Sequence, residues 1–409
     1  MSRPLDDITI LDLTWVLAGP FASMILCDLG AEVIKVERPP NGDISRTTGP
    51  YQNGWSGYFF SINRGKKSVA IDLQSAEGRE LFLRLAEKVD VVVENFTPGP
   101  LDRLGIGWGE LSARNPRLIL ASISGFGQTG PYSNRPALDI VVQAMGGVMS
   151  VTGEPGGGPV RPGASYGDLV AGMFAAIGVL TAIHERGRSG KGQAVDISML
   201  DCQVAMMENA IVRYLVTGEI PGPIGTRHPS ATPFQAFPTA DGHIVVALGF
   251  GVENQWGLLC AMLNTPELID DERFNTGPRR TANHAILEPL LSAAFMQRTT
   301  QEWLDDFLAA GIPCGPVNRG PELVDDEQGR FRGVIRGGTH PVAGTIPIAN
   351  SPVRMSRSET GIQGPPPSLG ANTIEVFQRL LGITEDEVQA LESRSVVATK
   401  GGPDISRIT

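Results

Sequence analysis

A single carboxylate, Asp168, lies where a loop rich in glycine and proline leads into an apolar helical stretch. Near the first turn of a helix, the helix dipole and the free backbone N–H groups favour an anion. The small neighbours Gly167, Ala171 and Gly172 leave room for a bulky group to approach. The local pattern therefore allows two roles for Asp168, a helix cap or a carboxylate that reacts with a ligand.

Basic side chains gather in the first third of the chain, although the whole sequence is acidic. They are Lys35, Arg38, Arg64, Lys66, Lys67 and Arg103. Each follows a predicted strand or lies in a predicted connection between a strand and a helix, and open α/β sheets bind ligands at that edge. Several cations there could hold a phosphorylated ligand, or they could be ordinary solvated side chains. The spacing leaves both interpretations open.

Two glycine-rich loops could bring backbone N–H groups close to a ligand. The loop Gly125–Gly130 matches GxGxxG, but a dinucleotide site requires this loop to open a helix. Pro131 follows at once, and no acidic residue closes a second strand about 20 residues later, so a tight turn is predicted. The loop that contains Gly249 and Gly251 could approach a ligand or could be a plain strand-to-helix turn.

The signatures of several other enzyme classes are absent from the sequence. The five histidines have no metal-ligand spacing, and HExxH is missing. The P-loop pattern and the GxSxG nucleophile elbow are missing as well. No metal site is predicted, and neither P-loop nor Ser-His-Asp chemistry is expected.

The composition is that of an ordinary globular protein. With 409 residues, 41% hydrophobic and 19% charged, the chain is long enough for two domains and a large core. The formal net charge of −10 argues against general nucleic-acid binding, which needs a basic surface. The four cysteines have no CxxC spacing, the N-terminus has no signal-peptide core, and the longest apolar run, residues 169–183, is too short to span a bilayer. We therefore expect reduced thiols, a cytoplasmic location and no membrane partner.

The hydrophobic pattern of the N-terminal part alternates between strands and helices that would position these residues. Strands are predicted at residues 8–13, 32–37, 69–73, 89–94 and 118–124, and helices at 21–29 and 75–88. Strands that alternate with helices of this length predict a Rossmann-like, doubly wound α/β fold with a mostly parallel sheet.

A different pattern begins near Arg227. Residues 234–239 and 243–248 flank Asp241-Gly242 and predict a β-hairpin, and helices are predicted at 253–263 and 300–310. Beyond Pro321 come short strands and a helix at 373–381. We predict the N-terminal part of a large domain at 1–220, a small α+β domain at 226–322, and a C-terminal segment at 323–409 that returns to the large domain.

The order of these motifs resembles the class III CoA-transferase (CaiB/BaiF) family, which includes formyl-CoA transferase and carnitine CoA-transferase. The resemblance covers nearly the whole chain. It rests on residues 17–21, 28–39, 63–68, 94–99, 101–105, 124–131 and 365–370. It implies that residues 1–220 belong to a CoA-binding domain, and that the protein is an acyl-CoA:carboxylate CoA-transferase that forms an interlocked homodimer.

The resemblance implies that Asp168 is the nucleophile. Its carboxylate would attack an acyl-CoA thioester to give a mixed anhydride and CoA thiolate, and the thiolate would then form an aspartyl-CoA thioester. The acceptor acid would repeat these steps in reverse order. Asp139 matches an acidic position near the site, or it could have a structural hydrogen-bonding role. Gly249 and Gly251 would shield or stabilise the intermediates, although this loop departs from the four-glycine version in formyl-CoA transferase. CoA and acyl-CoA are expected as substrates, with no permanently bound cofactor.

The first domain of this family binds the CoA nucleotide. The resemblance assigns CoA contacts to Arg38 and Arg103, which match best, and to Val16, Lys66, Lys67, Leu73, Asn95 and Phe96. The segments 160–163 and 225–228 look most like those of members that transfer CoA from succinyl-CoA to a dicarboxylate. Arg161, Arg227 or His228 could then pair with the second carboxylate of the acceptor.

Related activities differ at single positions. The α-methylacyl-CoA racemases pair the aspartate with a histidine in a Gly-His-Asp motif, and the aligned residue here is Leu138, which cannot carry a proton. Formyl-CoA:oxalate transfer is disfavoured because Leu17 replaces a glutamine. A non-catalytic CoA-binding paralogue would be recognised by a lost nucleophile. Asp168 is present, but the sequence alone does not dismiss this alternative.

Overall fold

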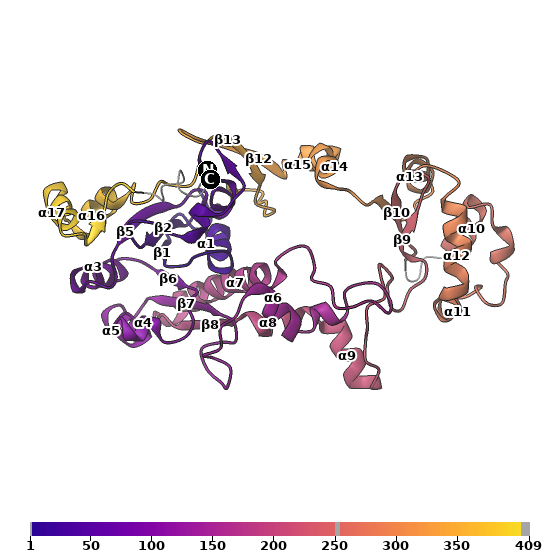
Figure 1. The fold of residues 1–409 in the computed structure, drawn as a ribbon, viewed down its shortest axis with the longest axis horizontal. Helices are drawn as coiled ribbons and strands as arrows, with labels where there is room; N and C mark the ends of the chain where they lie inside the picture. The colour runs from indigo at the N-terminus through magenta and orange to yellow at the C-terminus, as the bar shows by residue number, and fades with distance from the viewer. Residues whose placement is uncertain (1, 250–253, 402–409) are drawn as a thin grey trace. The chain divides into compact units, whose positions relative to one another are not determined.

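The computed structural model describes residues 2–249 and 254–401. Contacts divide the chain into two compact units (Figure 1). The larger unit comprises residues up to 149, 161–218 and from 328 onwards, and the smaller unit comprises 150–160 and 219–327. The predicted small domain was 226–322, without the separate segment 150–160. That segment groups with the smaller unit, in which the Gly225 N–H donates to the Gly153 carbonyl (2.9 Å).

Seven strands form the central sheet of the larger unit, in the order β14-β5-β2-β1-β6-β7-β8. They are β1 (Thr9–Asp12), β2 (Glu32–Glu37), β5 (Lys67–Ile71), β6 (Val91–Glu94), β7 (Ile119–Ser124), β8 (Ala194–Ser198) and β14 (Val397–Ala398). All neighbours are parallel except β14, which brings the C-terminal segment back antiparallel to β5. The strand order reverses between β1 and β6, so the predicted doubly wound α/β fold is confirmed.

Helices cover both faces of this sheet, and buried apolar residues form one core on each face. One core includes residues of α3 (Ala76–Ala86), α4 (Pro100–Arg103), α5 (Trp108–Arg114), α16 (Thr373–Leu381) and α17 (Glu385–Ser393). The other includes residues of α1 (Ala18–Asp28), α6 (Asp139–Met145), α7 (Tyr166–Ser189) and α8 (Met199–Met206). Successive strand residues alternate between the two cores, as Val91 and Val92 of β6 do.

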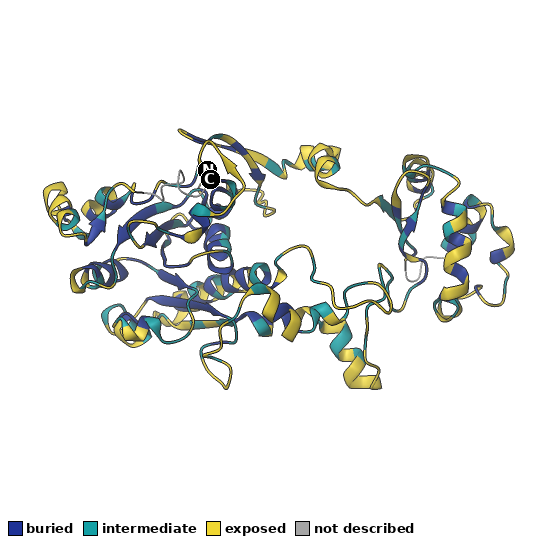
Figure 2. Cartoon of the chain, in the orientation of Figure 1, coloured by how far each residue is buried: buried dark blue, intermediate teal, exposed yellow. Residues whose placement is uncertain are grey.

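Shorter elements lie outside these layers. They are η1 (Ile44–Thr47), β3 (Tyr51–Gln52) paired with β4 (Trp55–Ser56), α2 (Gly57–Asn63), η2 (Val148–Ser150), α9 (Glu208–Thr217), α15 (Glu327–Arg332), and β12 (Ile335–His340) paired with β13 (Gly344–Ala349). Figure 2 shows that α9 is largely exposed, and none of its residues is buried.

The smaller unit folds around an antiparallel sheet of β9 (Phe234–Pro238), β10 (His243–Ala247) and β11 (Cys314–Pro316). The pairing of β9 with β10 confirms the predicted hairpin. Its helices are α10 (Gln255–Met262), η3 (Pro266–Leu268), α11 (Gly277–Ala282), α12 (His284–Phe295), α13 (Thr300–Ala309) and α14 (Gly320–Asp325). Aromatic rings fill its core, where Phe237 stacks on Phe295 with ring centroids 4.6 Å apart.

The helix that carries Asp168 is α7, which has 24 residues. It is longer than the apolar run 169–183, whose length predicts no membrane span. By length and composition alone, α7 could cross a membrane. However, Val170, Ala171 and Val179 are buried in the core of the larger unit. We therefore interpret α7 as a core helix.

The helices α7 and α1 approach each other closely at Gly172. A Cβ atom added to this residue would lie 2.7 Å from the Ala18 carbonyl oxygen and 3.0 Å from the ring of Phe21. The observed spacing of the two helices therefore requires glycine at this position. Because Asp168 lies about one turn earlier in α7, this contact also fixes Asp168 relative to the start of α1.

Replacing Gly172 by alanine should push α1 and α7 apart. We expect Gly172→Ala to lower the free energy of unfolding by about 1–3 kcal/mol, the usual effect of overpacking, as measured by chemical denaturation. Gly187→Ala is the matched control, because it lies in the same helix with no atom within 4 Å of an added Cβ. It should be neutral or stabilising by up to about 1 kcal/mol. Equal destabilisation by both variants would contradict the close contact.

Candidate active site

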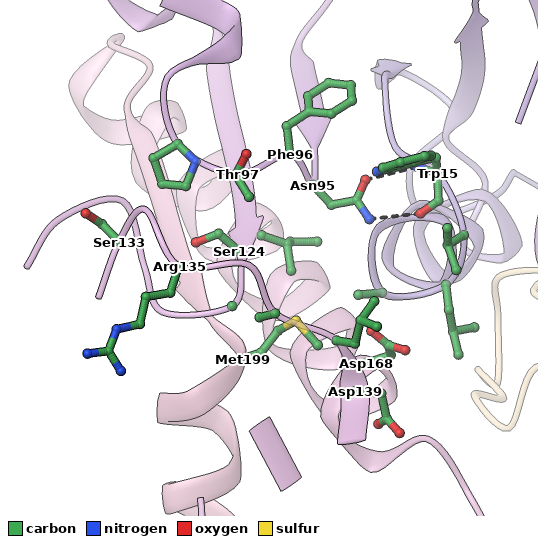
Figure 3. Close-up of a pocket in the computed structure, with 18 of the residues that line it drawn as sticks. Trp15, Asn95, Phe96, Thr97, Ser124, Ser133, Arg135, Asp139, Asp168 and Met199 are labelled. Carbon is green, nitrogen blue, oxygen red and sulfur yellow. Dashed lines mark hydrogen bonds between the residues drawn. The ribbon is translucent and has the colours of Figure 1, made fainter. Parts of the chain in front are cut away.

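A cavity of about 270 Å³ lies at the carboxyl ends of β1, β6 and β7, at the edge where the strand order reverses. It is lined by residues 15–18, 95–98, 100, 123–125, 133, 135, 137–139, 168 and 199, all of the larger unit. Figure 3 shows Asp139 and Asp168 near each other on one side and Arg135 on the opposite side. We call this space the Asp168 cavity.

Asp168 is the third residue of α7, and its side chain is partly buried. The residue that caps the helix is Ser165, so the helix-cap role for Asp168 is wrong. Burial raises the pKa of Asp168 to about 7, because it penalises the charged form; the nearby Asp139 acts in the same direction, and Arg161 opposes both. No hydrogen bond to the Asp168 carboxylate is found within residues 2–249 and 254–401. The carboxylate is therefore poised between its two protonation states near neutral pH.

Asp139, the first residue of α6, accepts hydrogen bonds from three residues. Its Oδ1 accepts the Gly167 N–H (2.8 Å), and its Oδ2 accepts Arg161 Nη2 (2.7 Å). Gln143 Nε2 donates to both carboxylate oxygens (2.8 Å each). A side chain at Gly167 would not fit, because its Cβ would lie 2.9 Å from Asp139 Oδ1. The Asp139 carboxylate thus fixes the backbone directly before Asp168.

Arg161 contacts Asp139 and the residue before α7. Its guanidinium pairs with Asp139 and also donates to Ser165 Oγ (3.0 Å), beside the start of α7. Arg161 is one of the three residues predicted to pair with the acceptor's second carboxylate. It is partly exposed, does not line the Asp168 cavity and compensates the charge of Asp139, so this role stays a prediction.

The segment between β1 and α1 forms another wall of the Asp168 cavity. Asn95 Oδ1 accepts the Trp15 N–H and Asn95 Nδ2 donates to the Trp15 carbonyl, both at 2.9 Å (Figure 3). The next residue, Val16, has a φ of 65°, a left-handed conformation that costs an L residue roughly 1–2 kcal/mol. Leu17 then precedes α1 without a side-chain cap, and Leu17 and Ala18 both line the cavity. The positive end of α1 therefore favours negative charge in this cavity.

A second cavity of about 440 Å³, which we call the Arg38 cavity, shares Trp15 and Phe96 with the first. The structure brings five of the eight predicted CoA contacts to these two cavities. Val16 and Asn95 line the Asp168 cavity, Arg38 and Leu73 line the Arg38 cavity, and Phe96 lines both. The exposed Arg38 supplies a cation to its cavity.

The other three predicted CoA contacts line neither cavity. Lys66 is buried, and its Nζ donates to Asp12, Ser23 and Asn63, each at 2.8 Å. This corrects its assignment, because the buried ammonium already has its partners and belongs to an internal ion pair. Lys67 pairs with Glu32 (2.8 Å) and Glu375 on the surface, and Arg103 is exposed at the end of α4.

The remaining predicted site residues lie in the smaller unit. The Gly249 N–H donates to Gln255 Oε1 (2.8 Å), and Gly251 lies outside the described residues. His228 Nδ1 accepts the Ser230 N–H (3.1 Å), next to Arg227. Their predicted roles at the site stay predictions. The GxGxxG loop behaves as expected, since no helix begins between β7 and α6.

Several residues that line the Asp168 cavity were not singled out from the sequence. Trp15 and Ser124 follow or end parallel strands, and Met199 follows β8, so a search of strand ends would have found them. A search of strand ends would not have found Arg135, because it lies within an irregular loop. Its guanidinium carbon is 3.5 Å from the centre of the Tyr132 ring.

The arrangement suits a carboxylate that acts as a nucleophile or a base. Asp168 faces a cavity with a helix N-terminus in its wall, while Asp139 is committed to hydrogen bonds. The described residues contain no group of three or more His, Cys, Asp or Glu side chains that could hold a metal ion.

Comparison with known proteins gives one consistent result. The sequence model of CoA-transferase family III matches residues 5–373. The chain is 40% identical over 396 residues to succinyl-CoA:glutarate CoA-transferase of Mus musculus, covering 97% of this chain and 90% of that protein. It is 40% identical over 399 residues to succinyl-CoA–D-citramalate CoA-transferase of Chloroflexus aurantiacus, covering 97% and 98%. The crystal structure of a CaiB/BaiF family protein from Brucella suis matches with a TM-score of 0.84 and 37% identity, covering 93% of this chain and all of that one.

The pKa of Asp168 should move in opposite directions when its two charged neighbours are removed. Asp139→Asn removes a negative charge but keeps an acceptor for the Gly167 N–H, so it should lower the pKa from about 7. Arg161→Met removes a positive charge and should raise it. The pKa is followed by ¹³C NMR of the carboxyl carbon, assigned with Asp168→Asn. Asp386→Asn on α17, which lines neither cavity, should leave it unchanged; shifts of one sign in both test variants would contradict the assigned causes.

Proposed function

The chain belongs to CoA-transferase family III and is an enzyme that moves CoA between carboxylic acids, and we propose that it transfers CoA from succinyl-CoA to a dicarboxylate through covalent intermediates on Asp168. The observation that carries this proposal is the Asp168 carboxylate itself. It lines a cavity beside a helix N-terminus, and no hydrogen bond within the described residues competes for its oxygens.

The proposed chemistry begins with attack of an Asp168 carboxylate oxygen on the thioester carbonyl carbon. The C–S bond breaks, CoA leaves as a thiolate, and a mixed anhydride remains on Asp168. The thiolate attacks the Asp168 carbonyl carbon, which releases the donor acid as a carboxylate and leaves an aspartyl-CoA thioester. The acceptor carboxylate repeats the two steps in reverse order and restores Asp168. No net proton or electron is required.

The surroundings of Asp168 would stabilise the negative charges that form in these steps. The first turn of α1, at Leu17 and Ala18, favours the oxyanion that forms when a carbonyl carbon is attacked. Arg161 compensates Asp139, so only one uncompensated carboxylate faces the incoming anionic substrate. Only the ionised form of Asp168 attacks. With a pKa of about 7, the rate should therefore rise with pH and level off above this value.

We propose that the nucleotide and phosphate groups of CoA bind in the Arg38 cavity. Because the two cavities share Trp15 and Phe96, a flexible chain can pass these rings from one cavity to the other. The Arg38 guanidinium would bind a phosphate group, and Leu73 and Phe96 offer apolar surface to the nucleotide or the pantetheine chain. Arg38, Leu73, Phe96, Asn95 and Val16 are the CoA contacts that we propose.

The preference for dicarboxylates is supported by Arg135. Among the described residues, it is the only lysine or arginine that lines the Asp168 cavity, and Asp168 and Arg135 lie on opposite sides of it (Figure 3). An acyl group attached to Asp168 would extend into this space, where a second carboxylate could pair with Arg135. The relatives named above act on succinyl-CoA with glutarate or D-citramalate, which both carry two carboxylates.

Racemisation of a 2-methylacyl-CoA is the weaker candidate. It needs an acid and a base on opposite faces of an α-carbon, and the residue beside Asp139 in the cavity is Leu138, which is 72% exposed and cannot transfer a proton. A non-catalytic role is less favoured, because a raised pKa at a carboxylate that lines a cavity is typical of functional sites.

Incubation with succinyl-CoA and a panel of mono- and dicarboxylates, followed by mass spectrometry of the CoA esters, tests the proposal. We expect new esters from dicarboxylates, and Asp168→Asn should lower the rate by at least about 10³-fold, because it removes the nucleophile. Hydroxylamine should modify Asp168 only when acyl-CoA is present. Asp201→Asn is the matched control, since Asp201 lies in the first turn of α8 outside both cavities; it should keep full activity.

A second arm of this experiment separates binding from chemistry. Arg38→Ala should raise the KM for succinyl-CoA by about tenfold and leave kcat nearly unchanged, because it removes one charged contact to a phosphate. Full transfer by Asp168→Asn would overturn the mechanism. Exchange of the α-hydrogen of a 2-methylacyl-CoA with deuterated water, without transfer, would instead support a racemase.

We also propose that two copies of the chain form a homodimer. Apolar side chains of α7 and α9 are exposed in the single chain, including Ile177 (56%), Leu215 (72%) and Val216 (77%). A partner surface would remove them from water. Analytical ultracentrifugation should give twice the mass of one chain; sedimentation as a single chain would contradict the dimer.

A further inference from the structure

We infer that the buried ion pair of Lys35 and Asp43 positions the cavity wall formed by residues 14–17, and is thereby part of what makes Asp168 reactive. Neither residue lines the Asp168 cavity, although Asp43 lines the Arg38 cavity. Each therefore acts on the Asp168 cavity through the backbone that it holds. The inference rests on the proposed CoA transfer, because it assigns this pair a function in that reaction.

The wall needs support because of its conformation. Val16 is β-branched, has a φ of 65°, and is 39% exposed to the cavity and solvent. Left-handed backbone is unfavourable for such a residue, so contacts elsewhere must hold it. Trp15, which precedes it, is 47% exposed and has no core packing that would fix the chain by burial alone.

Side chains supply these contacts one backbone group after another. The Thr14 N–H donates to Asp12 Oδ1 (2.9 Å), and the Thr14 carbonyl accepts Lys35 Nζ (2.6 Å). Asn95 bonds the N–H and the carbonyl of Trp15, and the Val16 N–H donates to Asp43 Oδ1 (3.2 Å). Five consecutive backbone polar groups are therefore held by Asp12, Lys35, Asn95 and Asp43 rather than by a helix or sheet.

The ion pair is the buried anchor of this arrangement. Lys35 Nζ lies 2.9 Å from Asp43 Oδ2, and the exposed fractions of the two side chains are 0% and 1%. Each partner of the pair also holds one backbone group of the wall, Lys35 the Thr14 carbonyl and Asp43 the Val16 N–H. Apolar residues of similar volume often stabilise a fold as well as a buried ion pair does, but they would leave these two groups without partners.

A second buried pair offers a matched comparison. Arg64 and Asp28 are exposed by only 4% and 2% and lie 2.6 Å apart in the same unit. Neither bonds any backbone group of residues 14–17, and neither lines the Asp168 or Arg38 cavity. Asp43→Ala and Asp28→Ala each remove a buried carboxylate and leave a buried cation, so they should destabilise the protein similarly but differ in their effect on the site. Because Asp43 also lines the Arg38 cavity, its loss could change the KM for succinyl-CoA, so kcat at saturating substrate is the value compared.

Two readouts decide the inference, both taken at a temperature where each variant is folded by its melting curve. Asp43→Ala should lower kcat for CoA transfer on the order of 100-fold, the effect of a misplaced catalytic wall, whereas Asp28→Ala should stay within about threefold. Hydrogen exchange followed by mass spectrometry should show faster exchange in the peptide spanning residues 13–18 for Asp43→Ala, and not for Asp28→Ala. Equal loss of kcat in both variants, or unchanged exchange in Asp43→Ala, would overturn the inference.

The double variant Lys35→Met/Asp43→Asn keeps the test informative if Asp43→Ala does not fold. It removes both buried charges and retains an acceptor for the Val16 N–H, but Lys35→Met leaves the Thr14 carbonyl without its donor. We therefore expect kcat to recover only in part, to within about tenfold of the unmodified enzyme. Recovery of stability without recovery of kcat would contradict positioning through Val16. If the unmodified protein transfers no CoA, the proposed function fails, and the exchange of residues 13–18 still shows whether the pair holds the wall.

Discussion

The position of Asp168 depends on one hydrogen bond, from the Gly167 N–H to Asp139 Oδ1. This bond ties the first turn of α7 to the start of α6, and it permits no side chain at 167. The same carboxylate needs Arg161 and Gln143 to compensate it, because a second unpaired charge beside Asp168 would oppose ionisation of the nucleophile. Gly167, Arg161 and Gln143 thus allow two carboxylates to lie close together, of which only Asp139 accepts hydrogen bonds within the described residues.

The sheet topology explains why this pair meets a substrate. The chain leaves β1 and β6 in opposite directions across the sheet, so the segments that follow them diverge and leave a cavity at their carboxyl ends. The neighbouring ends of β2 and β5 line the Arg38 cavity. The two cavities share Trp15 and Phe96, and the walls of both come from the ends of neighbouring strands, which is the arrangement on which the proposed CoA site rests.

Local sequence patterns predicted the parallel sheet, the β9–β10 hairpin and α16, because hydrophobic period and turn residues act over short distances. Asp168 itself required the family resemblance, since a carboxylate in a first helical turn is usually structural. Lys66 was misassigned because its partner Asp12 lies 54 residues away in sequence, and no local pattern distinguishes a solvated lysine from a buried one. The partnership of Arg161 with Asp139 was hidden for the same reason, as they are 22 residues apart. Tertiary pairing of charges is the part of the site that spacing alone did not reveal.

On the proposed mechanism, the buried surroundings of Asp168 disfavour its free carboxylate more than they disfavour the covalent intermediates. Burial without hydrogen bonds penalises the carboxylate, which is why its pKa is raised. The anhydride and the thioester on Asp168 carry no charge at that carboxyl group, so the same burial penalises them less than it penalises the free carboxylate. A carboxylate stabilised by several donors would be a weaker nucleophile and would lose those bonds on acylation. The hydrogen-bond donors of this region contact Asp139 instead, which holds the backbone before Asp168 in place. On the proposed mechanism, this division of roles leaves Asp168 free to react while Asp139 maintains the geometry.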